Sequence, residues 1–223
     1  LFPAVAQTHS TYMKQHSIAF SRRNITLEGI VTIPTDLPAP FPGVVLCHPH
    51  PLFGESMDSP VMQALCRALD GEGIATLRFN FRGVGGSGGS FDRGIGEQED
   101  LKSAIDTLKR WPRVNGRRIG VAGVSFGAVV ALDALTNVKG VGALAAVAPT
   151  ISAVRRSRLD KFKGEKLLMV GEKDLLVPPE DLSSVVTELS SPMEYIVVPG
   201  ADHTWAGYED RVAAQVTGFM AKA

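Results

Sequence analysis

Short apolar runs rich in β-branched residues alternate with amphipathic stretches along most of the chain. Six runs have the length of a strand, and the stretches between them carry apolar residues at helical spacing. The runs are 44–47, 74–79, 118–122, 141–147, 166–170 and 195–198. Strands that alternate with helices in this way predict an α/β fold, with a mostly parallel, doubly wound sheet and helices on both faces. Two earlier runs, 18–20 and 25–33, predict an additional pair of strands.

The chain of 223 residues contains no internal repeat and no linker that would separate two domains. We therefore predict a single domain over residues 13–223. The chain begins with Leu1, and Ala4–Ala6 has the small residues of a processing site. We interpret residues 1–12 as a leader or an artificially added segment outside the fold.

Charge and cysteine content exclude several classes of protein. Lys and Arg total 23, and Asp and Glu total 23, so the formal net charge is zero. This balance argues against binding to nucleic acid or to an anionic membrane surface. No segment approaches the roughly 20 apolar residues of a membrane span. Cys47 and Cys66 are expected to be buried free thiols. We expect a cytoplasmic protein, with secretion as the alternative, and the sequence leaves monomer and dimer open.

The segment Gly123–Gly127 reads G-V-S-F-G and lies between a predicted strand and a predicted helix. This is the G-x-S-x-G pattern in the strand–turn–helix context that it requires. A serine on so tight a turn has a strained backbone, and the two glycines avoid clashes with the neighbouring strand and helix. The turn presents the Ser125 hydroxyl above the sheet, and the helix start places the Phe126 N–H beside it. We therefore predict that Ser125 is a nucleophile.

A serine hydroxyl needs a general base to act as a nucleophile at neutral pH. His203 follows the last predicted strand and is the candidate base, and Asp174 follows the preceding strand. The order Ser125, Asp174, His203 matches one known order of serine triads. Three other acidic residues remain alternatives for the acid that orients the histidine: Asp160, Glu172 and Asp181.

The loop after the run 44–47 is the predicted source of a second donor for a transition-state oxyanion. It reads H-P-H-P-L-F-G, and its two prolines have no N–H to donate. His50 and Leu52 are therefore the candidates, and we favour His50. The first donor would be the N–H of Phe126.

These motifs together resemble the α/β-hydrolase superfamily. Residues 48–51 occupy the place of that family's His-Gly-x-Pro-like segment, with Pro49 where glycine is usual. The alignment gives His50 the position whose N–H faces the oxyanion. Arg82–Ser87 matches the family's Arg-Gly-x-Gly-x-Ser loop. Many relatives insert a lid where this chain has only residues 148–165, so it resembles the small, lidless bacterial serine hydrolases and esterases.

The resemblance covers the chain from about residue 16 to its end and implies a serine hydrolase without cofactor or metal. Small or short-acyl carboxylic esters are the predicted substrates, because an open cleft has no apolar cover for long chains. The reaction would pass through an acyl-enzyme, and thioesters and amides are alternative substrates for the same triad. Five apolar residues flank the predicted catalytic loops and are candidates for the mouth of the site, with core packing as the alternative for each: Leu52, Phe53, Met57, Leu175 and Trp205.

Three other functions fit parts of the sequence. His48, His50 and Asp58 could suggest a metal site, but there is no clear further ligand, and we expect His48 to support the site through hydrogen bonds. Gly83–Gly88 reads G-x-G-x-x-G, but no helix is predicted to start at once, which argues against dinucleotide binding. A non-catalytic binding protein on this fold usually lacks a triad member. All three candidate members are present here.

Overall fold

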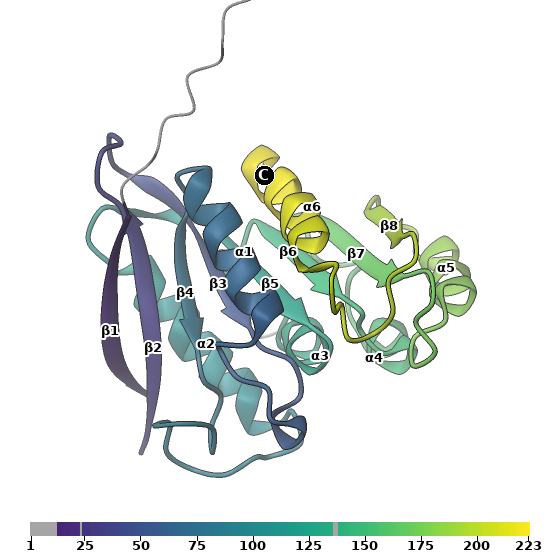
Figure 1. Cartoon of the computed structure of the whole chain (residues 1–223), viewed down its shortest axis with the longest axis horizontal. Helices are drawn as coiled ribbons and strands as arrows, with labels where there is room; N and C mark the ends of the chain where they lie inside the picture. The colour runs from purple at the N-terminus through teal and green to yellow at the C-terminus, as the bar shows by residue number, and fades with distance from the viewer. Residues whose placement is uncertain (1–12, 23, 136–137) are drawn as a thin grey trace, which may run out of the picture.

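The computed structural model describes residues 13–22, 24–135 and 138–223, so the predicted leader at residues 1–12 lies outside the described part of the chain. One eight-stranded sheet runs through the molecule in the order β1-β2-β4-β3-β5-β6-β7-β8 (Figure 1). Its strands are β1 (Met13–Arg22), β2 (Ile25–Pro34), β3 (Phe41–Cys47), β4 (Ala75–Phe79), β5 (Val114–Val124), β6 (Ala143–Val147), β7 (Glu165–Gly171) and β8 (Glu194–Val198).

The sheet is parallel except at one edge. Neighbouring strands from β4 through β8 in the sheet pair in parallel, whereas β1 pairs antiparallel with β2 and β2 pairs antiparallel with β4. The prediction of a mostly parallel sheet with an added N-terminal pair is confirmed. All six parallel strands therefore present their carboxyl ends at the same edge, where ligands bind in such sheets.

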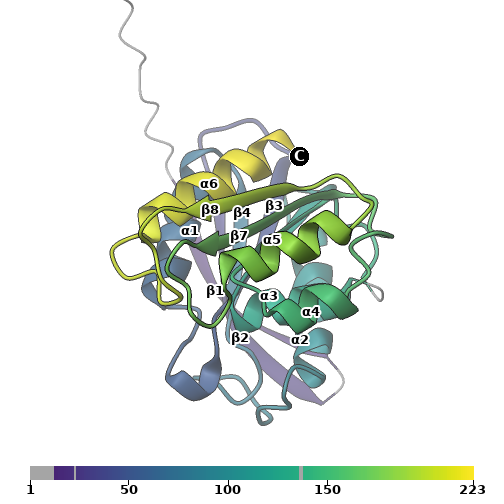
Figure 2. The same ribbon diagram turned by 90° about the vertical axis from the view of Figure 1, so that its right-hand side faces the viewer.

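Helices cover both faces of this sheet. In Figures 1 and 2, α1 and α6 lie on one face, and α2, α3, α4 and α5 lie on the other. Their bounds are α1 (Pro60–Gly71), α2 (Gly96–Lys109), α3 (Phe126–Ala134), α4 (Ile151–Arg156), α5 (Pro179–Glu188) and α6 (Glu209–Lys222). None of the helices in the described residues is long and apolar enough to cross a membrane.

Each face of the sheet has its own hydrophobic layer. In β3, Val44 and Leu46 pack with α1 and α6, whereas Val45 and Cys47 pack with α2 and α3. A strand buried on both faces needs apolar residues at every position, which explains the continuous apolar run in the sequence. Cys47 and Cys66 are both buried and free, as predicted.

The connection between β6 and β7 contains only the short helix α4. No lid domain is inserted at this point, as the sequence predicts. The carboxyl ends of the central strands therefore lie under loops rather than under an added domain. Those loops carry the residues of the candidate site.

Candidate active site

Ser125 lies on a sharp turn between β5 and α3. Its φ of 51° and ψ of −113° are unusual for a residue other than glycine and indicate a strained backbone. A Cβ on Gly123 would lie under 3.0 Å from the Gly127 carbonyl, and one on Gly127 would clash in the same way with the Cys47 carbonyl. A side chain at Gly123 would thus clash with the following helix, and one at Gly127 with the neighbouring strand, as predicted.

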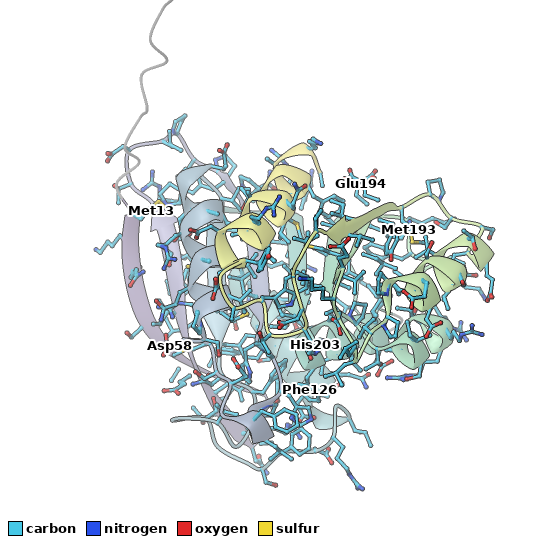
Figure 3. All side chains as sticks on the ribbon, turned by 45° about the vertical axis from the view of Figure 1, so that its right-hand side comes forward. Met13, Asp58, Phe126, Met193, Glu194 and His203 are labelled. Carbon is cyan, nitrogen blue, oxygen red and sulfur yellow. The ribbon has the colours of Figure 1, made fainter. Side chains whose placement is uncertain are left out.

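The structure brings Ser125, His203 and Asp174 together in one chain of hydrogen bonds. Ser125 Oγ lies 2.9 Å from His203 Nε2, and His203 Nδ1 lies 2.8 Å from Asp174 Oδ2. A carboxylate only accepts, so Nδ1 carries the proton and Nε2 is free to accept from the serine hydroxyl. Figure 3 labels His203 in the loop before α6, and Phe126, the neighbour of Ser125, at the start of α3.

Asp174 is held firmly in this arrangement. It is 2% exposed, and its second oxygen accepts the N–H groups of Leu176, at 3.0 Å, and Val177, at 2.8 Å. These bonds satisfy the carboxylate and fix the oxygen that faces His203. The three alternative acids lie elsewhere: Glu172 accepts from the Gly200 N–H, and Asp160 and Asp181 are exposed. None of the three has a recorded contact with the His203 ring.

A tight turn after β8 presents His203. Asp202, its neighbour, accepts both the N–H and the hydroxyl of Thr204, which lower the pKa of that carboxyl. Trp205 has a φ of 62°, another strained position close to the site. Asp202 is thus engaged with Thr204, and Asp174 is the carboxylate that reaches the imidazole.

The loop after β3 holds the other predicted donor. The Leu52 N–H donates to His50 Nδ1 at 3.3 Å, so this alternative donor already has a partner. The His50 N–H has no hydrogen-bond partner within the described residues. Phe126 is the first residue of α3, where the N–H has no acceptor within its own helix. Both predicted donors are therefore available to a ligand.

Aromatic rings pack around His50. Its ring centroid lies 4.9 Å from that of Phe126, 5.0 Å from Phe53 and 5.3 Å from Phe91. Phe91 also packs on Phe126, at 5.5 Å. These contacts tie the loop after β3 to the start of α3, the two segments that carry the predicted donors.

His48 does not reach Ser125. It is fully buried, and both ring nitrogens already have partners, at the Phe81 N–H and the Pro49 carbonyl. Burial lowers the pKa of His48 to about 4. A ring engaged in this way has no nitrogen left for a metal ion, so the alternative of a metal site with His50 and Asp58 gains no support. The expectation that His48 supports the site through hydrogen bonds fits its two contacts.

Ser125 and His203 line a cavity of about 660 Å³, within the usual range for small-molecule sites. Of the five apolar residues predicted at the mouth, Phe53 and Trp205 line this cavity. Three do not: Leu52 and Leu175 are exposed outside its wall, and Met57 is buried, with its N–H on Asn80.

Leu176, which no sequence pattern singles out, lines the cavity in place of Leu175. Both residues are exposed and follow Asp174 in the same loop. Asp174 Oδ1 accepts the Leu176 N–H and thereby orders that part of the loop. Residue type alone does not reveal this backbone hydrogen bond, so the sequence cannot show which of the two leucines faces the cavity.

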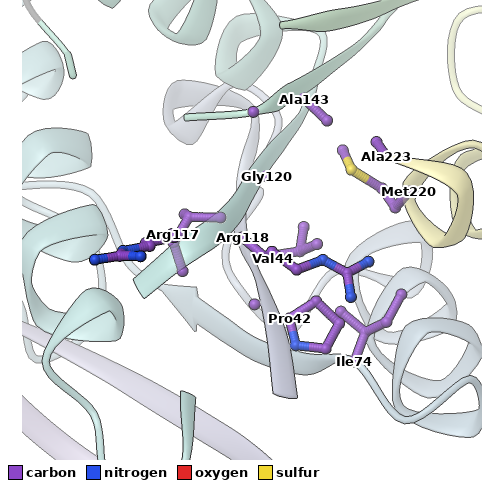
Figure 4. Close-up of a pocket in the computed structure, with 12 residues that line it drawn as sticks. Pro42, Val44, Ile74, Arg117, Arg118, Gly120, Ala143, Met220 and Ala223 are labelled. Carbon is purple, nitrogen blue, oxygen red and sulfur yellow. The ribbon is translucent and has the colours of Figure 1, made fainter. Parts of the chain in front are cut away.

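A second hollow, of about 70 Å³, lies at the opposite end of the strands (Figure 4). Pro42, Ile74 and Ala143 line it near the starts of β3, β4 and β6, and Met220 closes it from α6. It is much smaller than the cavity at Ser125 and lies at the amino ends of the strands, away from the expected ligand edge.

The glycine-rich segment after β4 forms an ordered loop. The Arg82 guanidinium donates two hydrogen bonds to the buried carboxylate of Asp100, at 3.0 and 2.8 Å, and its backbone N–H donates a third, at 3.1 Å. The next helix begins only at Gly96. A dinucleotide site needs a helix N-terminus directly after the glycines, so the geometry does not support that alternative.

A family model described as an alpha/beta hydrolase domain matches residues 43–217. An uncharacterised protein from Rickettsia prowazekii is 31% identical over 187 residues, covering 80% of this chain and 78% of that protein. An alpha-beta serine hydrolase homologue from Coxiella burnetii has a similar structure, with a TM-score of 0.80, 32% identity, and 91% and 96% of the two chains covered. An α/β serine hydrolase without lid from Xanthomonas campestris also has a TM-score of 0.80, with 26% identity and 94% of each chain covered.

Proposed function

The chain belongs to the α/β-hydrolase family, and from that premise we propose that it is a serine hydrolase that cleaves small or short-acyl carboxylic esters. One observation carries the proposal. The hydrogen-bond chain from Asp174 through His203 ends on the Ser125 hydroxyl, and Ser125 and His203 both line the 660 Å³ cavity. A base within hydrogen-bond reach of a nucleophile, itself oriented by an acid, is the arrangement that activates serine.

The proposed reaction follows from this arrangement. Ser125 attacks the acyl carbonyl while His203 Nε2 takes the hydroxyl proton, and His203 then gives that proton to the departing alcohol. Asp174 holds the imidazole with its proton on Nδ1 and stabilises the imidazolium that forms. Water then attacks the acyl-enzyme with His203 as the base, and the acid product leaves.

The N–H groups of Phe126 and His50 are the proposed donors to the oxyanion of each tetrahedral intermediate. Donors held in place before the reaction stabilise charge as it develops, without reorganisation of the protein. Loss of one such donor costs on the order of 3 kcal/mol of barrier. In the described structure both N–H groups are without a competing acceptor, which supports the assignment.

The open cleft supports small or short-acyl substrates. A long acyl chain gains most from a closed apolar cover, and the connection where relatives carry a lid has only α4. Activity on p-nitrophenyl esters is therefore expected to fall once the acyl chain exceeds about eight carbons, because the far end of a longer chain would stay in water. A steady rise beyond that length would overturn the short-acyl assignment.

Hydrolysis of p-nitrophenyl acetate and butyrate by the wild type and Ser125→Ala tests the proposal. Wild-type turnover and its near-total loss in the variant are expected. Ser184→Ala, the same change on an exposed serine of α5, is the matched control and should keep full activity. Equal turnover by the wild type and Ser125→Ala would show that the activity does not depend on this serine.

Parallel assays on a matched thioester and a matched anilide separate the alternative leaving groups. The proposal expects the oxygen ester to give the highest kcat/KM. Absence of turnover on all three, with ligand binding retained, would favour a non-catalytic binding protein on this fold.

A further inference from the structure

His48 lies buried beneath the loop that carries His50. Its Nε2 lies 3.1 Å from the backbone nitrogen of Phe81, and its Nδ1 lies 2.7 Å from the carbonyl oxygen of Pro49. A backbone N–H can only donate, so Nε2 must accept. The neutral ring therefore carries its proton on Nδ1 and donates it to the Pro49 carbonyl. Phe81 thus selects the tautomer of His48.

The carbonyl of Pro49 and the N–H of His50 belong to the same peptide unit. This peptide bond is trans. Among the described residues, the cis peptide bond is the one between Ala39 and Pro40. In a planar trans peptide the C=O and the N–H point in opposite directions. A hydrogen bond that holds the Pro49 carbonyl toward the buried ring therefore directs the His50 N–H away from that ring. His50 and Pro49 both line the cavity that contains Ser125.

Phe81, the partner of His48 Nε2, is itself held in place by the fold. Phe81 is fully buried and follows β4, which pairs with β3 so that Phe79 lies opposite Cys47. The rings of His48 and Phe81 pack with centroids 4.8 Å apart. The loop after β4 therefore holds His48 from behind, and His48 in turn holds the peptide that carries the donor.

We propose that His48 is the positioning residue for the predicted oxyanion donor, and that its Nδ1–H orients the Pro49–His50 peptide so that the His50 N–H meets the developing oxyanion. This inference rests on the proposed function, since it concerns the same reaction. His48 touches no substrate atom in this account. Donation to the carbonyl also polarises the peptide and makes its N–H a stronger donor.

Two substitutions separate the two contacts of the ring. In His48→Asn, the side-chain amide can keep a donor near the position of Nδ1 and so keep the bond to Pro49. In His48→Gln, the longer side chain can keep a partner for the Phe81 N–H near the position of Nε2 but loses the donor to Pro49. Both replace the ring by a neutral amide, so the pair is matched in polarity.

His48→Gln is expected to lower kcat on p-nitrophenyl butyrate about 30-fold to 100-fold, with KM within about threefold, because a misdirected donor loses most of its effect in the transition state. His48→Asn is expected to remain within about tenfold of the wild type. The affinity of a trifluoromethyl ketone, whose adduct with Ser125 carries an oxyanion, should fall in parallel with kcat/KM across the series. A purely structural role would lower the melting temperature of both variants without this parallel.

A measurement on the wild type does not depend on whether either variant folds. The ring nitrogens of ¹⁵N-labelled His48 should show the neutral Nδ1–H tautomer at pH 7 by NMR. An Nε2–H tautomer or a charged ring would overturn the proposal, as would a folded His48→Gln variant with wild-type kcat. Wild-type protein without Ser125-dependent turnover would instead contradict the proposed function, so the two failures can be told apart.

Discussion

Two regions of the site are held in place in different ways. The acid–base region consists of Ser125, Asp174 and His203, whose side chains contact one another directly. The proposed oxyanion loop, residues 48–54, would present a backbone N–H, and the direction of that N–H depends on His48 and Phe81 below it. In the proposed reaction, the first region contributes side-chain atoms. In the second region, the side chains would act only by orienting the backbone.

The two regions therefore require different substitutions to test them. Each side chain of the acid–base region can be truncated by itself, and we expect the loss to appear directly as a lower rate of the reaction. A backbone donor cannot be removed by truncating its own side chain, so it is reached only through the residues that fix its peptide. Gly127 lies where the two regions meet, because a Cβ there would clash with the carbonyls of Cys47 and His48.

Asp174→Asn alters the acid–base region alone. The amide oxygen can still accept the Leu176 and Val177 N–H groups, so folding should persist. The amide no longer holds His203 in the required tautomer, and kcat should fall by roughly 10⁴-fold. Steady-state kinetics on p-nitrophenyl butyrate measure this loss. Glu172→Gln is the matched control, and a reversed pattern would make Glu172 the orienting acid.

Gly127→Ala tests the contact between the two regions. The added methyl group meets backbone atoms of Cys47 and His48, which cannot move aside as a flexible side chain would. We expect a loss of about 3 kcal/mol or more in the free energy of unfolding, or a fall of roughly 6–12 °C in melting temperature.

Gly218→Ala on α6 is the control for this change. Apart from its chain neighbours and the backbone of α6 itself, no described atom lies within 4 Å of the added Cβ, so helix propensity should stabilise the protein by up to about 1 kcal/mol. Thermal unfolding followed by circular dichroism compares the two variants. If Gly127→Ala and Gly218→Ala had equal melting temperatures, α3 would not approach β3 closely enough for the added methyl group to clash.

Asp70 is a buried carboxylate outside both regions, and it contrasts with Asp174. It accepts the Thr76 hydroxyl at 3.0 Å and the weak Cys66 thiol at 3.4 Å, with no backbone N–H among its recorded partners. Burial raises its pKa from 3.8 to about 6. The folded state thus binds the proton more tightly than the unfolded state does. The stability from this group is present below about pH 4 and is lost as the pH rises to about 6.

Urea unfolding of the wild type and Asp70→Asn at several pH values isolates this contribution. Relative to the variant, the wild type should lose about 2 kcal/mol of unfolding free energy between pH 4 and pH 7. The two proteins share every other titrating group, so the difference reports Asp70 alone. A difference that stays constant with pH would mean that Asp70 is solvated in the folded protein.

The smallest expected effect comes from Phe91→Leu, which loosens the oxyanion loop from the side. Phe91 packs on both His50 and Phe126. Loss of these ring contacts should cost about 1 kcal/mol of transition-state stabilisation, roughly fivefold in kcat. Phe162→Leu, an aromatic residue packed on Lys166, is the control for the substitution. If the two variants have equal kcat, the rings do not order the loop.

The meeting of Ser125, Asp174 and His203 could be predicted from the sequence because its constraints are local. Ser125 requires glycines at fixed spacing between a strand and a helix, and His203 and Asp174 each follow a recognisable strand. The central strands β3 and β6 were also predictable, because burial on both faces makes such strands almost continuously apolar. The full length of β1, Met13–Arg22, was not predictable, since most side chains of this edge strand are exposed or only partly buried and several are polar.

The support beneath the oxyanion loop was not predictable in the same way. His48 and Phe81 are 33 positions apart, and their contact uses a backbone N–H that leaves no signature in residue type. The walls of the cavity were only partly predictable. Phe53 and Trp205 line it, whereas Leu52 and Leu175 do not, because loop conformation and not sequence position decides which side chain faces inward.

Covalent labelling tests whether Ser125 is the nucleophile. A fluorophosphonate reacts fastest with a serine that a neighbouring base activates, and intact mass with peptide mapping locates the adduct. We expect one adduct per chain, on Ser125, with labelling strongly slowed in His203→Gln because the base is lost. An adduct on another residue, or none while ester turnover persists, would contradict the assignment of Ser125 as the nucleophile.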